Sequence, residues 1–201
     1  MVTAPLEVNT LSNVQQGIDH WIKLGAIFVN LPWVVHPEFT AMTRPSFVDG
    51  ATDPITSHGT LVASGEQSFL QMYMEGNLRD NCMYVGWTPC FREEAVFDQQ
   101  HHFYFVKAEL FFPCPEDVHS SLTQMICDEI GLLSSITKIN PEFFAVERQN
   151  KNQWDITLHG IELGSYGIRA LPENKLYLYG TVVAEPRLSY ATKLASSGIT
   201  P

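Results

Sequence analysis

Residues suited to binding a nucleotide gather in the middle of the chain, where the run Phe91-Arg92-Glu93-Glu94 precedes His101, Phe105 and Glu109. Side chains alternate along a strand, so one face of it would carry His101, Phe103, Phe105, Lys107 and Glu109. Arg92 offers a planar fork of donors that suits a phosphate. Glu94 can accept a hydrogen bond from an exocyclic amine, and Phe105 can stack on a purine. The alternative is a surface hairpin with solvated charges and with Phe105 in the core.

Two carboxylates later in the chain suit a metal ion. Asp155 and Glu162 flank His159-Gly160, which is typical of a two-residue hairpin turn. With that turn Thr157 opposes Glu162, and Asp155 becomes a diagonal neighbour of Glu162 at about 7–8 Å. Such a pair can hold Mg²⁺ that takes its other ligands from water and from triphosphate oxygens. With Arg187 as a further cation, the two groups predict a site for a nucleoside triphosphate with magnesium. The alternative for the carboxylates is a pair that faces solvent.

Length and charge limit the other possibilities. The chain has 201 residues, of which 45% are hydrophobic and 17% charged, and this predicts one globular domain that is large enough to bury a core. The formal net charge of −10 works against a broad nucleic-acid surface, because such surfaces neutralise phosphates with Lys and Arg. A large tRNA-binding surface is therefore not expected, although a small basic patch stays open.

The sequence shows no targeting or membrane segment. No cationic segment leads into an apolar one at the N-terminus, and no apolar run approaches the roughly 20 residues that a membrane helix needs. The cysteines have neither a C-x-x-C pair nor zinc-type spacing, so we expect four free thiols: Cys82, Cys90, Cys114 and Cys127. We therefore predict a cytoplasmic protein without membrane contact.

The pattern of apolar residues predicts the elements that must hold these side chains. Ser12 is typical of a helix N-cap and Gly76 of a helix end. The pattern predicts helices over residues 12–24, 66–75, 116–133 and 186–195. It predicts strands over residues 26–35, 83–91, 101–112, 143–148, 153–158, 161–164 and 175–183, and a loop over residues 36–55. Strands grouped in hairpins with flanking helices indicate an α+β fold with a mostly antiparallel sheet.

Three motifs in a fixed order give the chain a resemblance to a known family. Gly25 is followed seven residues later by Pro32-Trp33-Val34, the run from Phe91 to Glu94 leads into His101, Phe105 and Glu109, and Gly180 precedes Arg187-Leu188. In this order they resemble the motifs of class II aminoacyl-tRNA synthetase catalytic cores. The segment 155–169 is similar to that of aspartyl enzymes, and Ser64-Gly65-Glu66 is similar to the amino-acid loop of asparaginyl enzymes. The resemblance is closest to this aspartyl/asparaginyl group.

The resemblance implies ATP as a substrate and assigns roles to the residues around it. Arg92 would clamp the α-phosphate, Glu94 would read the adenine amine, and His101 would approach the terminal phosphates. Phe105 would lie beneath the adenine and Arg187 above it. Arg92 and Arg187 would be the catalytic residues that stabilise the developing charge.

The resemblance also implies a magnesium site and an amino-acid pocket. Asp155 and Glu162 would hold Mg²⁺. Arg169 matches the arginine that meets the substrate's side-chain carboxylate in aspartyl enzymes, so it favours aspartate or a close analogue. Ser64 and Glu66 would line the end of the pocket that binds the amino group.

Some features depart from the family pattern. Val182 and Ala184 stand where the third motif usually has glycines, which would narrow the room beside the nucleotide. Tyr166 lies in a turn that is otherwise rich in glycine and would reshape the amino-acid pocket. We expect residues 1–201 to form a single catalytic-core domain without an anticodon-binding domain, which argues against ordinary tRNA charging.

The leading hypothesis is an adenylate-forming ligase that activates an amino acid with ATP. It would pass the acyl group to an acceptor, which is the acceptor end of a tRNA, ammonia or an amine on another protein. A second hypothesis is a non-catalytic, regulatory paralogue that binds nucleotide or amino acid, and a third is an unrelated α+β structural protein. Because the family buries its first motif between subunits, the resemblance also implies a homodimer with residues 21–35 in the interface.

Overall fold

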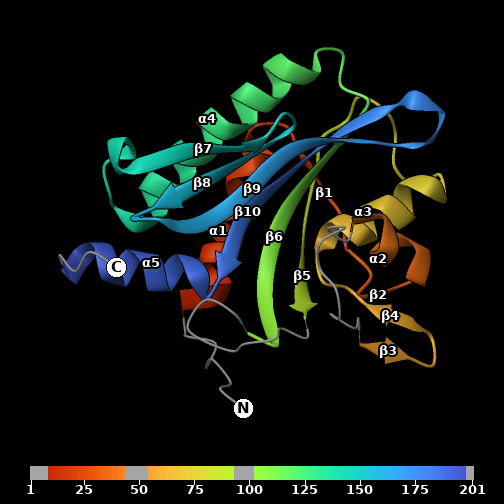
Figure 1. Cartoon of the computed structure of the whole chain (residues 1–201), viewed down its shortest axis with the longest axis horizontal. Coiled ribbons are helices and arrows are strands. Elements are labelled where there is room, and N and C mark those ends of the chain that lie inside the picture. Colours follow the sequence, from red (N-terminus) through yellow and green to blue (C-terminus); the bar gives the residue numbers. More distant parts are fainter. Residues whose placement is uncertain (1–8, 44–53, 93–101, 198–201) are drawn as a thin grey trace.

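The centre of the protein is a seven-stranded sheet with the order β1-β5-β6-β10-β9-β8-β7 (Figure 1). The computed structural model describes residues 9–43, 54–92 and 102–197. Neighbouring strands are antiparallel, except that β1 is parallel to β5. The strands are β1 (Ile27–Phe28), β5 (Tyr84–Phe91), β6 (Tyr104–Pro113), β7 (Phe144–Asn150), β8 (Gln153–Leu158), β9 (Ile161–Ala170) and β10 (Leu176–Glu185). The predicted α+β fold with a mostly antiparallel sheet is confirmed.

Three helices cover one face of this sheet (Figure 1): α1 (Asn9–Lys23), α4 (Val118–Thr137) and α5 (Arg187–Ser197). All three contact β10, and α4 and α5 also contact β9. The main hydrophobic core lies between these helices and the sheet and includes Trp21, Met125, Ile156 and Leu178. Burial of such side chains is the dominant favourable contribution to folding, so it fixes which face of each strand points to the helices.

In the described part of the chain, shorter elements cover one end of the opposite face. They are α2 (Pro37–Thr43), α3 (Gly65–Met74) and a small sheet of β2 (Val34–Val35), β4 (Gly59–Leu61) and β3 (Ile55–Thr56). α3 begins after Ser64, whose side chain accepts a hydrogen bond from the backbone of Glu66. Phe69 and Leu70 of this helix pack on Phe111 and Tyr177 of the large sheet in a second core. Two short 3₁₀ helices, η1 (Pro141–Phe143) and η2 (Pro172–Asn174), complete the described elements.

The β8–β9 hairpin turns at His159-Gly160, as predicted. Both residues have positive φ, 51° and 76°, which is typical of a tight type I′ turn. Thr157 pairs with Glu162, as predicted, but a bulge between Ile156 and Thr157 then places Asp155 opposite Ser165. The extra residue is Leu163 of β9, so Asp155 lies opposite Ser165 and not Gly164, but it is still two residues from the partner of Glu162, as the predicted diagonal pairing requires.

Residues 26–35 do not form the single strand that their apolar character predicts. β1 pairs with β5, whereas β2 pairs with β4 in the small sheet. Pro32 lies between them and has no N–H group for a strand ladder, so the chain can leave one sheet and join another. Residues 36–55 are not all loop either, since α2 buries Phe39 and Thr40. β9 extends beyond its predicted end at residue 164 because it continues to pair with β10 as far as Ala170.

Two further properties bear on the surroundings of the protein. All four cysteines are free thiols. Of the helices in the described part of the chain, none has the length and apolar character needed to span a membrane.

Candidate functional site

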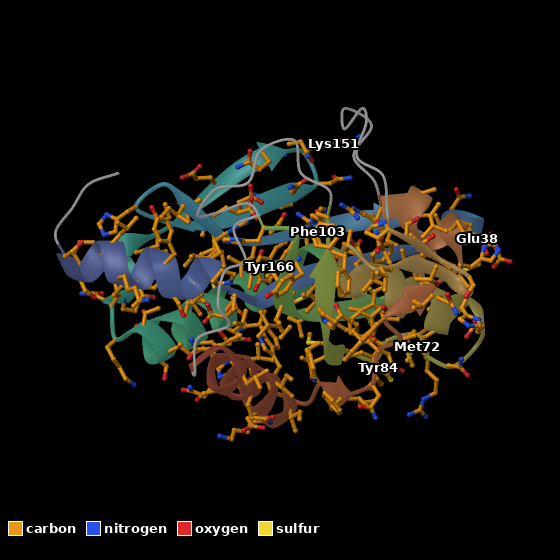
Figure 2. The ribbon with its side chains drawn as sticks, turned by 90° about the horizontal axis from the view of Figure 1, so that it is seen from below. Glu38, Met72, Tyr84, Phe103, Lys151 and Tyr166 are labelled. Carbon is orange, nitrogen blue, oxygen red and sulfur yellow. The ribbon has the colours of Figure 1, made fainter. Side chains whose placement is uncertain are left out.

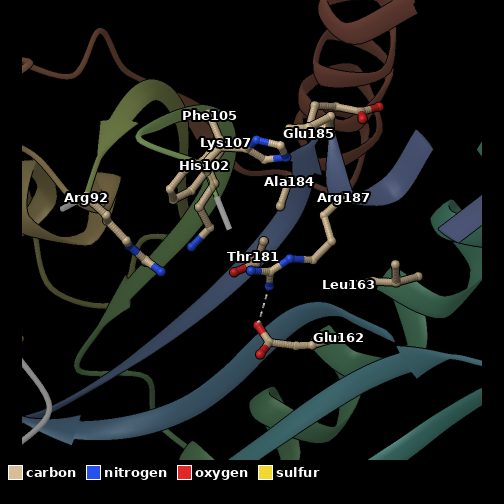
Figure 3. Close-up of a pocket in the computed structure, with 11 residues that line it drawn as sticks. Arg92, His102, Phe105, Lys107, Glu162, Leu163, Thr181, Ala184, Glu185 and Arg187 are labelled. Atoms are coloured by element: carbon tan, nitrogen blue, oxygen red, sulfur yellow. Dashed lines mark hydrogen bonds and ion pairs between the residues drawn. The ribbon is translucent and has the colours of Figure 1, made fainter. Parts of the chain in front are cut away.

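A pocket lies on the face of the sheet that α1 and α4 leave free, beside β6 and β10 (Figure 3). It encloses about 480 Å³, part of which is open to solvent. Phe105 and Lys107 of β6 face the pocket, while Val106 and Ala108, which alternate with them, belong to the core behind the sheet. Four pocket residues are ones that the sequence predicts to bind ATP or its metal: Arg92, Phe105, Glu162 and Arg187.

Arg92 and Phe105 lie together on one wall of this pocket. The guanidinium carbon of Arg92 is 5.0 Å from the centroid of the Phe105 ring, which is within the range of a cation–π contact. Arg92 Nε donates a hydrogen bond to the backbone oxygen of Ala63 at 3.2 Å. These two contacts hold the side chain at the end of β5, with its terminal nitrogens at the pocket.

Arg187 approaches from the other wall. It is the first residue of α5, and its Nη1 lies 3.1 Å from Glu162 Oε1 in the ion pair drawn in Figure 3. The start of α5 is held by Glu185, which is fully buried. Glu185 accepts hydrogen bonds from Asn13 Nδ2 at 2.6 Å and from the backbone N–H of Ser189 at 3.1 Å. Glu185 was not among the residues predicted from the sequence, because its partner Asn13 lies 172 residues earlier.

Asp155, the other predicted metal ligand, is buried on β8. Its Oδ1 makes a hydrogen bond to none of the described residues. Burial raises the pKa of Asp155, and the negative charge of Glu162 adds to this shift. Asp155 does not line the pocket, and the described residues contain no group of three or more His, Cys, Asp and Glu placed to hold a metal. The unpaired oxygen of Asp155, together with Glu162, nevertheless fits a cation that takes its remaining ligands from phosphate and water.

A second polar cluster lies next to the start of α3. Arg169 Nη1 and Glu66 Oε2 form an ion pair at 2.7 Å, and the Tyr177 hydroxyl donates to Glu66 Oε1 at 2.7 Å. The guanidinium of Arg169 stacks on the Tyr179 ring at 4.4 Å. Burial raises the pKa of Glu66, and Arg169 opposes this shift. Arg169, predicted to meet a substrate carboxylate, is thus paired with a carboxylate of the protein itself.

Glu109 and Lys107 lie between this cluster and the pocket. Glu109 Oε1 accepts from the Ser64 hydroxyl at 2.6 Å, and the Gly65 N–H also donates to the carboxylate. Lys107 Nζ is 2.6 Å from Glu109 Oε1. Burial alone would raise the pKa of Glu109, but Lys107 and these hydrogen bonds hold it below its ordinary value, so the buried carboxylate stays ionised. The alternation along β6 places Lys107 and Glu109 on one face, as predicted, but their ion pair was not predicted.

The structure thus brings the predicted residues into two neighbouring groups. Ser64, Glu66 and Arg169 belong to the polar cluster, and Asp155 lies on the adjoining strand β8. Glu94 and His101 are outside the described residues.

The two residues that replace glycines in the third motif lie on different sides of the sheet. Ala184 lines the pocket, as predicted. Val182 does not, and the prediction that it narrows the pocket is wrong. A bulge in β10 between Thr181 and Val183 turns Val182 toward α1, where it packs closely on Gly17.

Tyr166 is fully buried on the helix side of the sheet (Figure 2), so the prediction that it reshapes an amino-acid pocket is wrong. Side chains alternate along this part of β9, and Tyr166 and Ile168 both belong to the core on the helix side. The Tyr166 hydroxyl donates to the backbone oxygen of Thr181, and its ring lies against Gly180. Nearby, Glu129 of α4 is buried and accepts from Trp21 Nε1 at 3.0 Å.

Residues 21–35, predicted to lie in a subunit interface, divide into two sets. The first set belongs to the core of this chain: Trp21, Ala26, Leu31 and Val35. The second set is apolar but between 39% and 50% exposed: Ile22, Leu24, Ile27, Phe28 and Trp33. Of the second set, Ile27 and Phe28 form β1, which is an edge strand of the large sheet.

Comparison with known proteins gives matches among solved structures. No protein-family model and no curated protein matches the chain. Seryl-tRNA synthetase from Pyrococcus horikoshii, complexed with ATP, matches with a TM-score of 0.73 and 19% identity over 95% of this chain and 52% of that chain. Two structures of pyrrolysyl-tRNA synthetase from Desulfitobacterium hafniense both match with a TM-score of 0.69. Their identities are 13% and 14%, over 94% and 95% of this chain and 68% and 70% of theirs.

The fold is therefore that of class II aminoacyl-tRNA synthetase catalytic cores. The chain spans about half the length of the Pyrococcus enzyme, 52%. These structures are seryl and pyrrolysyl enzymes, so the aspartyl/asparaginyl grouping stays a prediction from the sequence motifs.

Proposed function

We propose that the protein is an ATP- and Mg²⁺-dependent ligase that activates an amino acid by forming its adenylate. The observation that carries the proposal is that Arg92, Phe105 and Arg187 line one pocket (Figure 3). Guanidinium groups suit phosphates, and an aromatic ring offers a surface for a purine. The surrounding fold is similar to that of a seryl-tRNA synthetase solved with ATP.

In the proposed reaction, a carboxylate oxygen of the amino acid attacks the α-phosphorus of ATP. An oxygen–phosphorus bond forms, the bond from the α-phosphorus to the bridging oxygen breaks, and pyrophosphate leaves with that electron pair. Arg92 holds the α-phosphate, Arg187 offsets charge on the phosphate oxygens, and Phe105 positions the adenine. Catalysis of this kind works through positioning and electrostatics. Glu94 and His101 keep their predicted roles at the adenine amine and the terminal phosphates.

Asp155 and Glu162 would hold Mg²⁺, which supplies positive charge to the phosphate oxygens when bound. The buried Oδ1 of Asp155, which has no partner among the described residues, and the pocket-lining carboxylate of Glu162 suit a hard cation with few protein ligands. Glu162 is paired with Arg187 in the structure. Binding of ATP would move Arg187 from Glu162 to the nucleotide and release Glu162 for the metal.

The proposed amino acid resembles aspartate or asparagine, and the Glu66–Arg169 pair favours the uncharged amide. Glu66 already neutralises Arg169 at 2.7 Å. A substrate carboxylate would have to be desolvated beside a pair with no net charge, which is unfavourable. An amide oxygen can accept from Arg169 without adding a charge. Ser64 and Glu66 would line the end that binds the amino group, and the acceptor of the acyl group would be a tRNA acceptor end, ammonia or another amine.

A specific observation favours the second candidate, a regulatory paralogue that binds nucleotide or amino acid without catalysis. Two of the three arginines that would meet substrates, Arg169 and Arg187, are paired with carboxylates of the protein. Ala184 also stands in the pocket wall where the family's third motif usually has a glycine.

Exchange of labelled pyrophosphate into ATP distinguishes these candidates. The full chain is assayed with Mg²⁺ and each standard amino acid in turn, and ATP binding is measured by calorimetry in parallel. Exchange that depends on one amino acid supports the ligase. ATP binding without exchange for any amino acid supports the regulatory paralogue, and absence of both contradicts the nucleotide site.

A further inference from the structure

Lys107 occupies the place between the proposed nucleotide pocket and the amino-acid cluster. It lies on the same face of β6 as Phe105 and Glu109, its neighbours at two residues on either side. Phe105 lines the pocket, and Glu109 binds Ser64 and Gly65 at the start of α3. Residues two apart on a strand are separated by roughly 7 Å, so the Lys107 side chain can reach toward either group.

The hydrogen-bonding capacity of Lys107 is only partly used. Its ammonium group has three donors, and one of them bonds to Glu109 Oε1 at 2.6 Å. Within the described ranges Lys107 makes no other hydrogen bond or ion pair. Its side chain is 13% exposed, so a substrate that covered the pocket would find the ammonium group already held in place.

Glu109 does not need Lys107 as its only donor. The carboxylate also accepts from the Ser64 hydroxyl and from the Gly65 N–H. Lys107, by contrast, has Glu109 as its one described partner and lines the pocket itself. The ion pair with Glu109 therefore fixes a cation in the pocket wall. A lysine that only neutralised Glu109 would not have to line the pocket.

A cation at this place meets a specific need of adenylation. The amino-acid carboxylate and the α-phosphate are both anions, and they must approach to bonding distance against their Coulomb repulsion. Figure 3 shows Lys107 between Arg92 and Arg187 in the pocket wall. Fixed positive charge where two anions meet lowers the energy of the transition state, because it does not have to be reorganised during the reaction.

We propose that Lys107 is a third cationic residue of the reaction centre, whose ammonium group holds the attacking carboxylate against the α-phosphate. This inference rests on the proposed adenylation. Lys107 keeps its proton throughout, while the carboxylate oxygen bonds to phosphorus and pyrophosphate leaves with the electron pair of the broken bond. Glu109 fixes the ammonium group from below the substrates.

The test is Lys107→Met, which removes the charge and keeps most of the length of the side chain. We expect pyrophosphate exchange to fall about 100-fold, as for loss of one charge-stabilising donor. The KM of the amino acid should rise by a larger factor than the Kd of ATP, because the lysine binds the carboxylate. Lys175→Met is the matched control, since Lys175 forms a similar ion pair with Asp80 at 3.1 Å outside the pocket, and its exchange rate should not change.

The double variant Lys107→Met/Glu109→Gln tests whether the role of Lys107 is purely structural. It removes both charges and leaves no unpaired buried carboxylate, so it can be assayed even if the single variant fails to fold. If Lys107 only neutralised Glu109, the double variant would recover exchange, and this would overturn the inference. We expect it to remain defective. If the wild type and the Lys107→Met variant exchange pyrophosphate equally fast, only the role of Lys107 is overturned. If the wild type neither exchanges pyrophosphate nor binds ATP, the proposed function is overturned as well.

Discussion

Arg187 Nη1 lies 3.1 Å from Glu162 Oε1, so a residue predicted to bind ATP and a residue predicted to bind its metal are bound to each other. The two side chains are 23% and 47% exposed. An ion pair with this much exposure contributes at most about 1 kcal/mol. A bound triphosphate offers Arg187 several anionic oxygens, and Mg²⁺ offers Glu162 a divalent charge. The pair is therefore weak enough to be exchanged for both ligands.

Replacement of Glu162 should weaken the contribution of Mg²⁺ to ATP binding. We expect Glu162→Ala to lower ATP affinity in the presence of Mg²⁺ and to raise it slightly in EDTA, because Arg187 loses its competing partner. Asp155→Ala should act in the same direction. Calorimetric titration of ATP with and without Mg²⁺ measures this, and Glu75→Ala, which changes an exposed carboxylate at the end of α3, is the control. Equal affinities for all four proteins with Mg²⁺ would reassign the pair to solvent.

Replacement of Arg92 should remove activity and leave the fold intact. Arg92→Ala loses one hydrogen bond to Ala63 and a ring contact, which together are worth about 1–2 kcal/mol of stability. We expect pyrophosphate exchange to disappear while the Tm falls by only a few degrees.

Arg148→Ala is the matched control for this variant. Arg148 also lies over an aromatic ring, 5.5 Å from Trp154, and donates through Nε to a backbone oxygen at 2.9 Å. It is outside the pocket, so exchange should persist. Retained exchange in the Arg92 variant would exclude Arg92 from the mechanism.

The buried Glu129 should make stability depend on pH. Burial raises the pKa of Glu129 well above its ordinary value of 4.5. Between 4.5 and the folded-state pKa, the folded chain keeps a proton that the unfolded chain has lost, so the free energy of unfolding decreases as pH rises through this window. Glu129→Gln stays neutral and removes this dependence.

Thermal unfolding across pH values checks the Glu129 prediction. The Tm of the Glu129→Gln variant relative to that of the wild type should increase as pH rises above 4.5. Glu142→Gln, an exposed carboxylate in η1, should give a parallel curve to the wild type. A constant difference between wild type and Glu129→Gln at all pH values would mean that Glu129 is ionised in the fold.

The exposed apolar surface along β1 should hold two copies of the chain together. Ile27 and Phe28 are 41% and 39% exposed on an edge strand of two residues. We expect the wild type to be a dimer at micromolar concentration and Phe28→Glu to be a monomer, because the variant places a charge in an apolar contact. Light scattering after gel filtration measures the mass. Leu11→Glu, at 61% exposure on α1, should remain dimeric, and a monomeric wild type would contradict the interface.

Much of the architecture follows from the sequence because spacing within one element is fixed by local geometry. The alternation along β6 predicts that Phe105, Lys107 and Glu109 share a face, and Phe105 and Lys107 do line the pocket. The His159-Gly160 turn fixes the pairing of Thr157 with Glu162. Ser64 caps α3, and its hydroxyl also donates to Glu109, 45 residues later. No pattern within a single element predicts this second contact.

Only the tertiary structure determines the strand registers and the contacts between distant segments. One extra residue in β10 turns Val182 away from the pocket, and one in β9, Leu163, places Asp155 opposite Ser165. Arg169 is paired with Glu66, 103 residues earlier, although its spacing alone matched a substrate-binding arginine. The sequence therefore determines the types and the order of the chemical groups. Their pairing is decided by bulges and by packing, since both depend on the free energy of the whole fold and not on any single segment.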